Sequence, residues 1–452
     1  MIFAAIEWIG MNRMKRCPLV RLSMLLAVVT GPFLFGSGAS AQVPGAVGQP
    51  LPRDEDRRTP TEREAENYDP NGVRIGSFIL YPAIEADETF VDNIYATSAA
   101  TGKQAGFVQQ FNPTLDLRSD WNNHMLNLYA RSGIALYSVD PSLNDYQDVS
   151  VGGDGRLDIQ RNWYLLGGAS WNRQHEVRGT PNTVTGAGLP VTVYNQASAN
   201  IGYFQKFNRL SVRLDGRFDN FNYLDNGLGP ALGVIPNNNR NRNEWREAAR
   251  LGYEFLPGYE VWVRGSLNQR TYFQLDSSGL DRSSYGFDIV GGILIDLGAV
   301  TSVEFFAGYL QQNFVNNQFA TNSAPTFGLT GYWNPIRELW IKPFIRRTVD
   351  DSALTSSASY ISTTGGLDVN YYWKPNIRLD GSASYLVADY TQFAGNPSPP
   401  YDQYWTFRAG AMYLPTRNFY VGPVYQFIHR TSNQFNADFD QNTIMLRLGA
   451  RL

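Results

Sequence analysis

The chain alternates apolar and polar residues from Pro82 to Leu452, in stretches of about ten residues or more. This period of two is the pattern of β-strands that have one apolar and one polar face. Long polar loops and tight turns join the stretches alternately, so that two strands, one loop and one turn repeat about every forty residues. The tight turns are predicted near Trp121, Arg161, Asn208, Pro257, Gly298, Pro335, Pro375 and Thr416.

The pattern predicts eighteen strands, and because two short apolar segments are hard to place, a count of sixteen stays open. An even number returns both ends of the chain to the same side, as in bacterial single-chain barrels. The predicted strands cover about 83–96, 105–118, 124–138, 145–159, 163–176, 193–206, 210–223, 243–255, 259–272, 284–297, 301–314, 325–334, 339–350, 360–373, 377–391, 403–414, 418–430 and 442–452.

Strand length decides between two all-β folds. A soluble β-sandwich would show the same alternation, but its strands usually have about five or six residues. A tilted strand needs about 9–11 residues to cross a bilayer. We therefore predict an all-β fold, a transmembrane antiparallel up-and-down β-barrel of about 18 strands. Short turns such as 206–209 would face the periplasm and long loops such as 224–242 the outside, with both termini inside.

Charges show which face of the strands is wet. In the last strand, Ile444, Leu446 and Leu448 share one face, and Arg447 and Arg451 share the other. A charge on the lipid face at mid-depth would cost roughly 2–4 kcal/mol. The charged face must then line the lumen, and because Asp288 and Asp296 share this parity with the acids named next, the lining is predicted to be roughly balanced in sign. The predicted lumen residues are Arg131, Arg213, Asp215, Arg217, Asp219, Glu260, Arg264, Arg378, Asp380, Arg408, Arg447 and Arg451.

The N-terminal region predicts export. Basic residues from Met14 to Arg16 precede an apolar run over 22–35 and a small-residue cleavage pattern at 39–41, as in a secretory signal peptide. We divide the chain into a signal peptide (1–41), a flexible, Pro-rich periplasmic segment (42–72) and an outer-membrane β-barrel (73–452). Within this last part, 73–80 is a short apolar strand that Pro82 interrupts; it either pairs at the rim or begins the first spanning strand.

Charge and cysteine content exclude some classes. The formal net charge is -3, and removal of Arg13, Lys15, Arg16, Arg21 and Glu7 with the signal takes away +3, which leaves -6. A mildly acidic chain does not favour nucleic acid as a partner. The single cysteine, Cys17, lies in the signal, so the mature chain has no thiol and no disulfide.

Few residues offer chemistry. The three histidines, His124, His175 and His429, are far apart in the sequence and predict no metal site or other cofactor. An outer-membrane lipid hydrolase would need a lipid-facing serine near a histidine, and Ser432 beside His429 is the one candidate. Glycines at 152–155 lie within an alternating strand with no helix after it, which favours packing over a phosphate loop.

Aromatic residues have two predicted roles. Those beside the tight turns would form an interfacial girdle: Trp163, Tyr259, Trp333, Trp340, Trp373, Phe419 and Tyr420. Tyr129, Trp262 and Trp340 point inward by parity. These three would either stack on sugar rings or fill space.

The segment 74–82, followed by Asp92-Asn93-Ile94-Tyr95, resembles the opening of the putative β-barrel porin 2 family of Gram-negative outer-membrane barrels. Several members are encoded in exopolysaccharide gene clusters. Members often carry a second acid before the position of Asp92, where this chain has Val91. Asp92 and Asn93 would then either bind a divalent cation or cap a turn.

We predict an integral protein of the cell outer membrane that is not an enzyme. Its expected partners are outer-membrane lipid and lipopolysaccharide, the barrel assembly machinery, and a polysaccharide or small hydrophilic solutes. It would provide a passive polar channel for an exopolysaccharide or another hydrophilic solute. Two alternatives stay open: an occluded barrel that acts as an envelope scaffold, and the lipid hydrolase.

Overall fold

The computed structural model describes residues 68–181, 183, 188–227, 233–298, 300–352, 354, 357–391 and 398–452. The signal peptide predicted over 1–41 and most of the predicted periplasmic segment lie outside these residues. None of the helices in the described ranges has the length and apolarity of a transmembrane helix.

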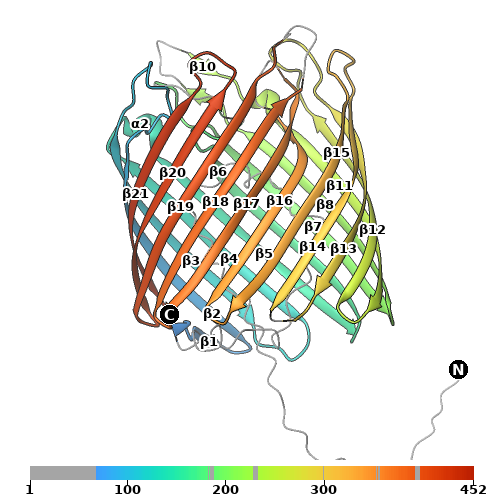
Figure 1. The fold of residues 1–452 in the computed structure, drawn as a ribbon. Helices are drawn as coiled ribbons and strands as arrows, with labels where there is room; N and C mark the ends of the chain where they lie inside the picture. The colour runs from blue at the N-terminus through green and yellow to red at the C-terminus, as the bar shows by residue number, and fades with distance from the viewer. Residues whose placement is uncertain are drawn as a thin grey trace, which may run out of the picture.

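Eighteen long antiparallel strands form a closed barrel, as predicted (Figure 1). Each strand pairs with its neighbours in sequence, and the ring closes where the first long strand pairs with the last, from Ala83 opposite Arg451 to Val91 opposite Thr443. The strands are β2 (Phe78–Val91), β3 (Gly106–Ser119), β4 (Met125–Tyr137), β5 (Tyr146–Gln160), β6 (Trp163–His175), β7 (Val193–Phe207), β8 (Leu210–Tyr223), β11 (Arg242–Leu256), β12 (Tyr259–Tyr272), β13 (Ser284–Asp296), β14 (Thr301–Phe314), β15 (Asn322–Ile336), β16 (Leu339–Asp351), β17 (Ser359–Lys374), β18 (Ile377–Tyr390), β19 (Tyr401–Thr416), β20 (Phe419–Ser432) and β21 (Phe439–Arg451).

Short elements lie at the two ends of the barrel. At the tight-turn end, β1 (Val73–Ile75) pairs with the first three residues of β2, where β21 has ended. At the loop end lie β9 (Asn226–Gly227), β10 (Val234–Ile235), the helix α2 (Pro141–Asn144) and the 3-10 helix η3 (Asn238–Arg240). The tight turns thus all lie at one end, together with the C-terminus (Figure 1).

The first strand was predicted wrongly. It spans Phe78–Val91 instead of 83–96, and Pro82 lies inside it. The Leu452 amide donates to the Pro82 carbonyl oxygen at 3.1 Å. Because the N and O atoms of one residue point to the same neighbouring strand, the missing N–H of Pro82 faces the end of the chain beyond β21. The ladder to β3 therefore loses no hydrogen bond.

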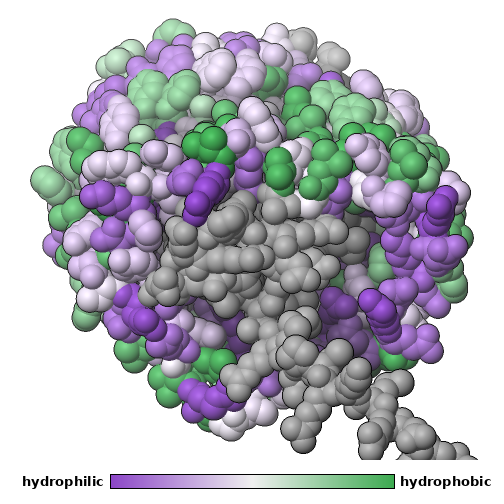
Figure 2. All heavy atoms as spheres, turned by 60° about the horizontal axis from the view of Figure 1, so that its bottom comes forward, coloured by the Kyte–Doolittle hydropathy of each residue, from purple (hydrophilic) through white to green (hydrophobic). Residues whose placement is uncertain are grey.

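The outer face of the wall is apolar. In β21, Ile444, Leu446 and Leu448 are 56%, 48% and 52% exposed, whereas Arg447 between them is 5% exposed. Figure 2 turns the tight-turn end toward the reader, and hydrophobic residues lie over the wall in the upper part of this view. Of the predicted girdle, Trp333, Trp373 and Phe419 are exposed near tight turns. The predicted sorting of faces is thus the one in the structure.

Candidate functional site: the lumen and its loop end

All twelve residues predicted to line the lumen lie on the inward face of their strands. The opposite parity of the same strands carries exposed apolar residues, such as Leu128, Leu214 and Leu379. The twelve come from six strands: Arg131 from β4; Arg213, Asp215, Arg217 and Asp219 from β8; Glu260 and Arg264 from β12; Arg378 and Asp380 from β18; Arg408 from β19; Arg447 and Arg451 from β21.

The four residues of β8 form two ion pairs along one strand. Arg213 Nε lies 2.9 Å from Asp215 Oδ2, and Arg217 Nε lies 2.7 Å from Asp219 Oδ2. Gln196 also donates a hydrogen bond to Asp219, at 3.0 Å. Residues two apart share a face of a strand, so each pair forms inside the lumen.

Glu260 and Arg264 pair across strands. Arg250 of β11 bridges Glu260 at 3.0 Å and Glu304 of β14 at 2.7 Å. Arg264 pairs with Asp288 at 3.1 Å. Arg250 and Glu304 were absent from the predicted set, although their inward parity on β11 and β14 was a usable signal.

Two predicted arginines pair with carboxylates outside the predicted set. Arg131 donates a hydrogen bond to Asp116 at 2.8 Å. Arg447 lies 3.3 Å from Glu85 and 3.5 Å from Asp87, across the seam that closes the barrel.

The last four predicted residues lack a close ion pair among the residues described. Arg451 donates to the carbonyl oxygen of Tyr68 at 2.7 Å, near the tight-turn rim. Arg378 Nε lies 4.0 Å from Asp380 Oδ1. Arg408 forms no ion pair within the described part of the chain.

Cations cover two of the three inward aromatic rings. The guanidinium of Arg250 lies 4.1 Å from the ring centre of Trp262, which is 6% exposed. Arg131 lies 4.8 Å from the ring centre of Tyr129. These contacts favour packing for both rings over stacking on sugars. Trp340 is half-buried on β16.

The upper part of β16 separates from β15 and turns toward the lumen, while it stays paired with β17 up to Asp351 opposite Ser359. Arg270 of β12 donates to the carbonyl oxygen of Val349 at 2.9 Å, although β13, β14 and β15 lie between β12 and β16 in the wall. Pairing between β15 and β16 stops at Gly328 opposite Arg346. Beyond this point, the Thr326 hydroxyl donates to the Arg347 carbonyl oxygen at 2.8 Å.

Two prolines explain why β16 separates from β15. The Asn334 amide donates to Val300, so by alternation the nitrogen of Pro325 faces β16. The register places Pro325 opposite Val349, whose carbonyl oxygen therefore has no amide donor. Pro343 of β16 faces the same seam by the same alternation. Where both strands present a proline nitrogen to each other, neither can donate a hydrogen bond there, so the two strands behave like the edges of separate sheets.

The end of β16 is held by a buried set of polar side chains, which we call the Asp351 cluster: Asp351, Arg242, Tyr272 and Arg282. The Tyr272 hydroxyl donates to the Asp351 carboxylate. Guanidinium nitrogens of Arg242 and Arg282 each lie 3.6 Å from the same carboxylate. All four side chains are less than 10% exposed.

Apolar contacts join the connection between β16 and β17 to other loops. Ala358, just before β17, packs with Leu280 and Phe319 of two other loops. Leu354 packs on the opposite side, against a group that includes Ala96 and Tyr404. The connection between β16 and β17 therefore bridges the two sides of the loop end.

Other loops pack against one another at the loop end. Arg178 stacks 4.9 Å from the ring centre of Tyr95, and burial lowers the pKa of Arg178. Burial, together with the hydrogen bond to Asp140, raises the pKa of the Tyr95 hydroxyl. Burial alone would lower the pKa of Arg240, but the carboxylate of Glu176, 2.5 Å away, holds it above its ordinary value.

Asp92 and Asn93 anchor the first loop. Both carboxylate oxygens of Asp92 accept hydrogen bonds from Asn442, from its amide and its side chain, at 2.7 Å. The side-chain oxygen of Asn93 accepts from the Thr97 amide at 3.1 Å. These bonds favour turn capping over a cation site, and the described residues include no cluster of three or more acidic, His or Cys ligands.

A family model described as putative beta-barrel porin 2 matches residues 66–452. The chain belongs to this family. The match spans the whole barrel, including the Asp92–Asn93 anchor. No curated protein matches the chain.

Solved outer-membrane barrels are similar in fold. The ferric enterobactin receptor PfeA of Pseudomonas aeruginosa is 8% identical, with a TM-score of 0.43 over 82% of this chain and 80% of that chain. The siderophore receptor PirA of Acinetobacter baumannii is 9% identical, with a TM-score of 0.43 over 82% and 80%. OpdO of P. aeruginosa is 13% identical, with a TM-score of 0.42 over 82% and 97%.

The hydrolase constellation does not form around Ser432. Its hydroxyl accepts from the Gln434 amide at 3.1 Å. His429 bonds instead to Asp440 at 2.6 Å and to Thr431 at 3.2 Å. Ser432 and His429 also lie on opposite faces of β20, because they are three residues apart.

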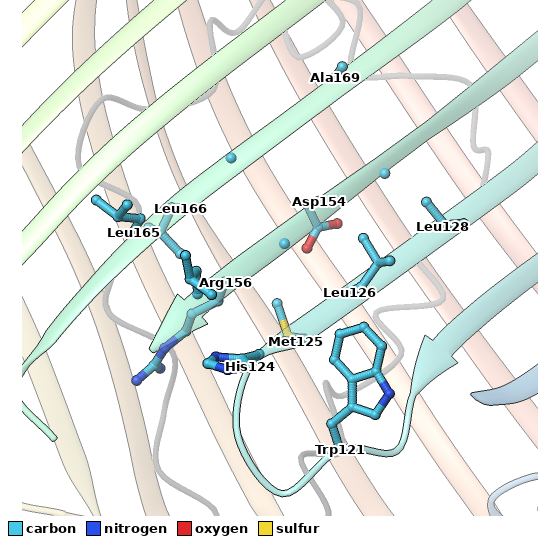
Figure 3. Close-up of a pocket in the computed structure, with 14 residues that line it drawn as sticks. Trp121, His124, Met125, Leu126, Leu128, Asp154, Arg156, Leu165, Leu166 and Ala169 are labelled. Carbon is cyan, nitrogen blue, oxygen red and sulfur yellow. The ribbon is translucent and has the colours of Figure 1, made fainter. Parts of the chain in front are cut away.

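The glycines at 152–155 shape the outer wall. Gly153 and Gly155 face outward on β5, opposite Ala169 and Gly167 of β6. Figure 3 shows the shallow groove that results, with Leu126 and Leu128 beside it and Trp121 at the tight-turn end. Packing therefore accounts for this motif, and the groove lies on the lipid side, away from the lumen.

Proposed function

We propose that this porin-family barrel is an outer-membrane channel for hydrophilic solutes, with its tight-turn end in the periplasm. The supporting observation is the contrast within the lumen. Many charged side chains of the wall stay partly exposed below the mouth, such as Arg213 at 14% and Asp288 at 25%, while the residues of the Asp351 cluster are buried. A polar surface that stays accessible inside a closed barrel suits a water-filled path.

The Asp351 cluster would keep this path closed at the loop end. It ties β16 to side chains of β11, of β12 and of the loop after β12. Loss of the carboxylate would leave two buried guanidinium groups to repel each other. The end of β16 and its connection to β17 would then move and widen the mouth.

Current through planar bilayers tests the proposal. The wild-type barrel should conduct weakly, and Asp351→Asn should raise its open probability at least about fivefold, the effect of about 1 kcal/mol. Asp389→Asn is the matched control, because Asp389 is exposed on the outer face of β18 and should leave the current unchanged. A silent barrel for all three proteins would overturn the channel proposal.

That silent outcome would instead support the envelope scaffold. The buried cover of the mouth is the observation that favours it as the second candidate. No contact of the described residues favours an exopolysaccharide over another hydrophilic solute. If deletion of the gene leaves the amount of secreted exopolysaccharide unchanged, passage of the polymer through this barrel is contradicted.

Export through a cleaved signal peptide remains part of the proposal. Mass spectrometry of the protein from outer membranes should give an N-terminus at Gln42. A chain that retains Met14 would contradict it. Assembly by the barrel machinery and contact with lipopolysaccharide would follow export.

A further inference from the structure

We propose that the lumen wall formed by β16, β17, β18 and β19 binds oxyanions, such as the carboxylate or phosphate groups of small solutes, and that the channel prefers anions for this reason. This inference rests on the proposed channel and names its class of solute.

One row of inward side chains crosses these four strands at the same height. The strand register places Lys342 of β16 opposite Asp368 of β17, Asp368 opposite Ser382 of β18, and Ser382 opposite Arg408 of β19. Lys342 and Arg408 both act electrostatically on Asp368, one from each side. Two cations thus share one carboxylate, and neither comes within 4.0 Å of it.

A third cation lies above this row. Arg346 has the inward parity of Lys342, four residues further along β16. It interacts electrostatically with Asp350, nearer the mouth. Among the residues described, Arg346, Arg408 and Lys342 form no ion pair or hydrogen bond. Besides Asp368, Lys342 has the Tyr332 ring 5.6 Å away, and Arg408 interacts electrostatically with Asp380.

On the opposite wall, the arginines are paired with carboxylates. There Arg213, Arg217, Arg250 and Arg264 each contact a carboxylate at 2.7 to 3.1 Å. A paired guanidinium has little attraction left for a passing solute. Among the described wall residues, the wall from β16 to β19 therefore holds three cations without an ion pair, and Arg118 of β3, which has the Tyr81 ring 4.7 Å away, is a further one near the tight-turn rim.

Hydroxyl groups surround these cations. Thr364, Ser382, Ser384 and Thr406 face inward between Arg346, Lys342 and Arg408. All four hydroxyl side chains are half-exposed. Lysine and arginine side chains only donate hydrogen bonds, and hydroxyls can donate as well. Such a surface matches the acceptor oxygens of carboxylate and phosphate better than it matches a neutral solute.

Ion selectivity tests the inference. In a potassium chloride gradient, the reversal potential of the Asp351→Asn barrel should show that chloride passes more readily than potassium. Combined Lys342→Gln, Arg346→Gln and Arg408→Gln substitutions on that background should lower the permeability ratio at least about fivefold, since each cation adds to the local potential. Arg173→Gln, on the exposed outer face of β6, is the matched control and should change nothing.

Anion binding can be measured even if the barrel carries no current. Calorimetric titration of the folded protein with inorganic phosphate and with acetate should show binding that the triple variant loses and Arg173→Gln retains. Current without anion preference, or a triple variant with unchanged selectivity, would overturn the anion site while leaving the channel intact. Absence of current together with absence of binding would overturn both proposals.

Discussion

Arg242 shows how single residues keep charge inside this barrel. Its side chain is 1% exposed, its Nε lies 2.8 Å from Glu244, and its guanidinium stacks 4.2 Å from the ring centre of Phe221. Removing a guanidinium from water costs several kcal/mol unless partners and packing compensate. Glu244 and Phe221 provide that compensation, so Arg242 acts as a structural residue at the mouth.

Substitution Arg242→Met should lower the free energy of unfolding by about 3 kcal/mol, because it leaves part of the charge of Glu244 and Asp351 buried without a partner. Urea unfolding in lipid vesicles, followed by tryptophan fluorescence, measures this. Arg173→Met on the outer face should stay within about 0.5 kcal/mol of wild type. Equal stabilities for the two variants would show that the buried ion pairs contribute little.

Two glycines on either side of β13 make a matched test of packing in the wall. A Cβ atom at Gly308 of β14 would lie 2.0 Å from the Ile289 carbonyl oxygen, whereas one at Gly265 of β12 would meet nothing within 4 Å. Gly308→Ala should therefore cost about 1–3 kcal/mol of unfolding free energy, and Gly265→Ala should be neutral or slightly stabilising. If both substitutions cost the same, the close approach at Gly308 is not real.

Strands and turns were largely predictable at the scale of elements. Period-two alternation and turn residues placed seventeen of the eighteen strands within a few residues and put every tight turn at one end. The exception was the first strand. There Pro82 looked like an interruption, because the pattern alone does not show which neighbour its nitrogen faces.

The weak seam between β15 and β16 could not be predicted in the same way. Pro325 and Pro343 are visible in the sequence, but each breaks the ladder only on the side that its nitrogen faces. That both face one seam depends on the register of three strand pairs. The pairing of Arg250 with Glu304 depends on register too.

The seam should be visible in hydrogen exchange. The amides of Ser323 and Phe327 alternate with those bonded to β14 and face the part of β16 that has left the wall. They should exchange faster than amides in the middle of β18, which pair on both sides. Mass spectrometry of peptides from each strand measures this, and equal protection would mean that β16 stays in the wall.

The whole molecule combines an apolar exterior, a charged lumen and a loop end where β16 and several loops pack together. Family membership and barrel closure agree with a porin-like function. In the proposed function, the inward end of β16 decides between a channel and a plugged scaffold. The central claim is therefore that release of the Asp351 cluster opens a path through the lumen.

Cross-linking that cluster tests the claim most directly. The chain from Gln42 onward has no cysteine, so Tyr272→Cys with Asp351→Cys would introduce its only two thiols. Single-channel recording should show current through the unlinked double variant and its loss once a short bismaleimide joins the two thiols. Current that persists unchanged after complete cross-linking would contradict the claim, because the solute path would then not depend on the position of β16.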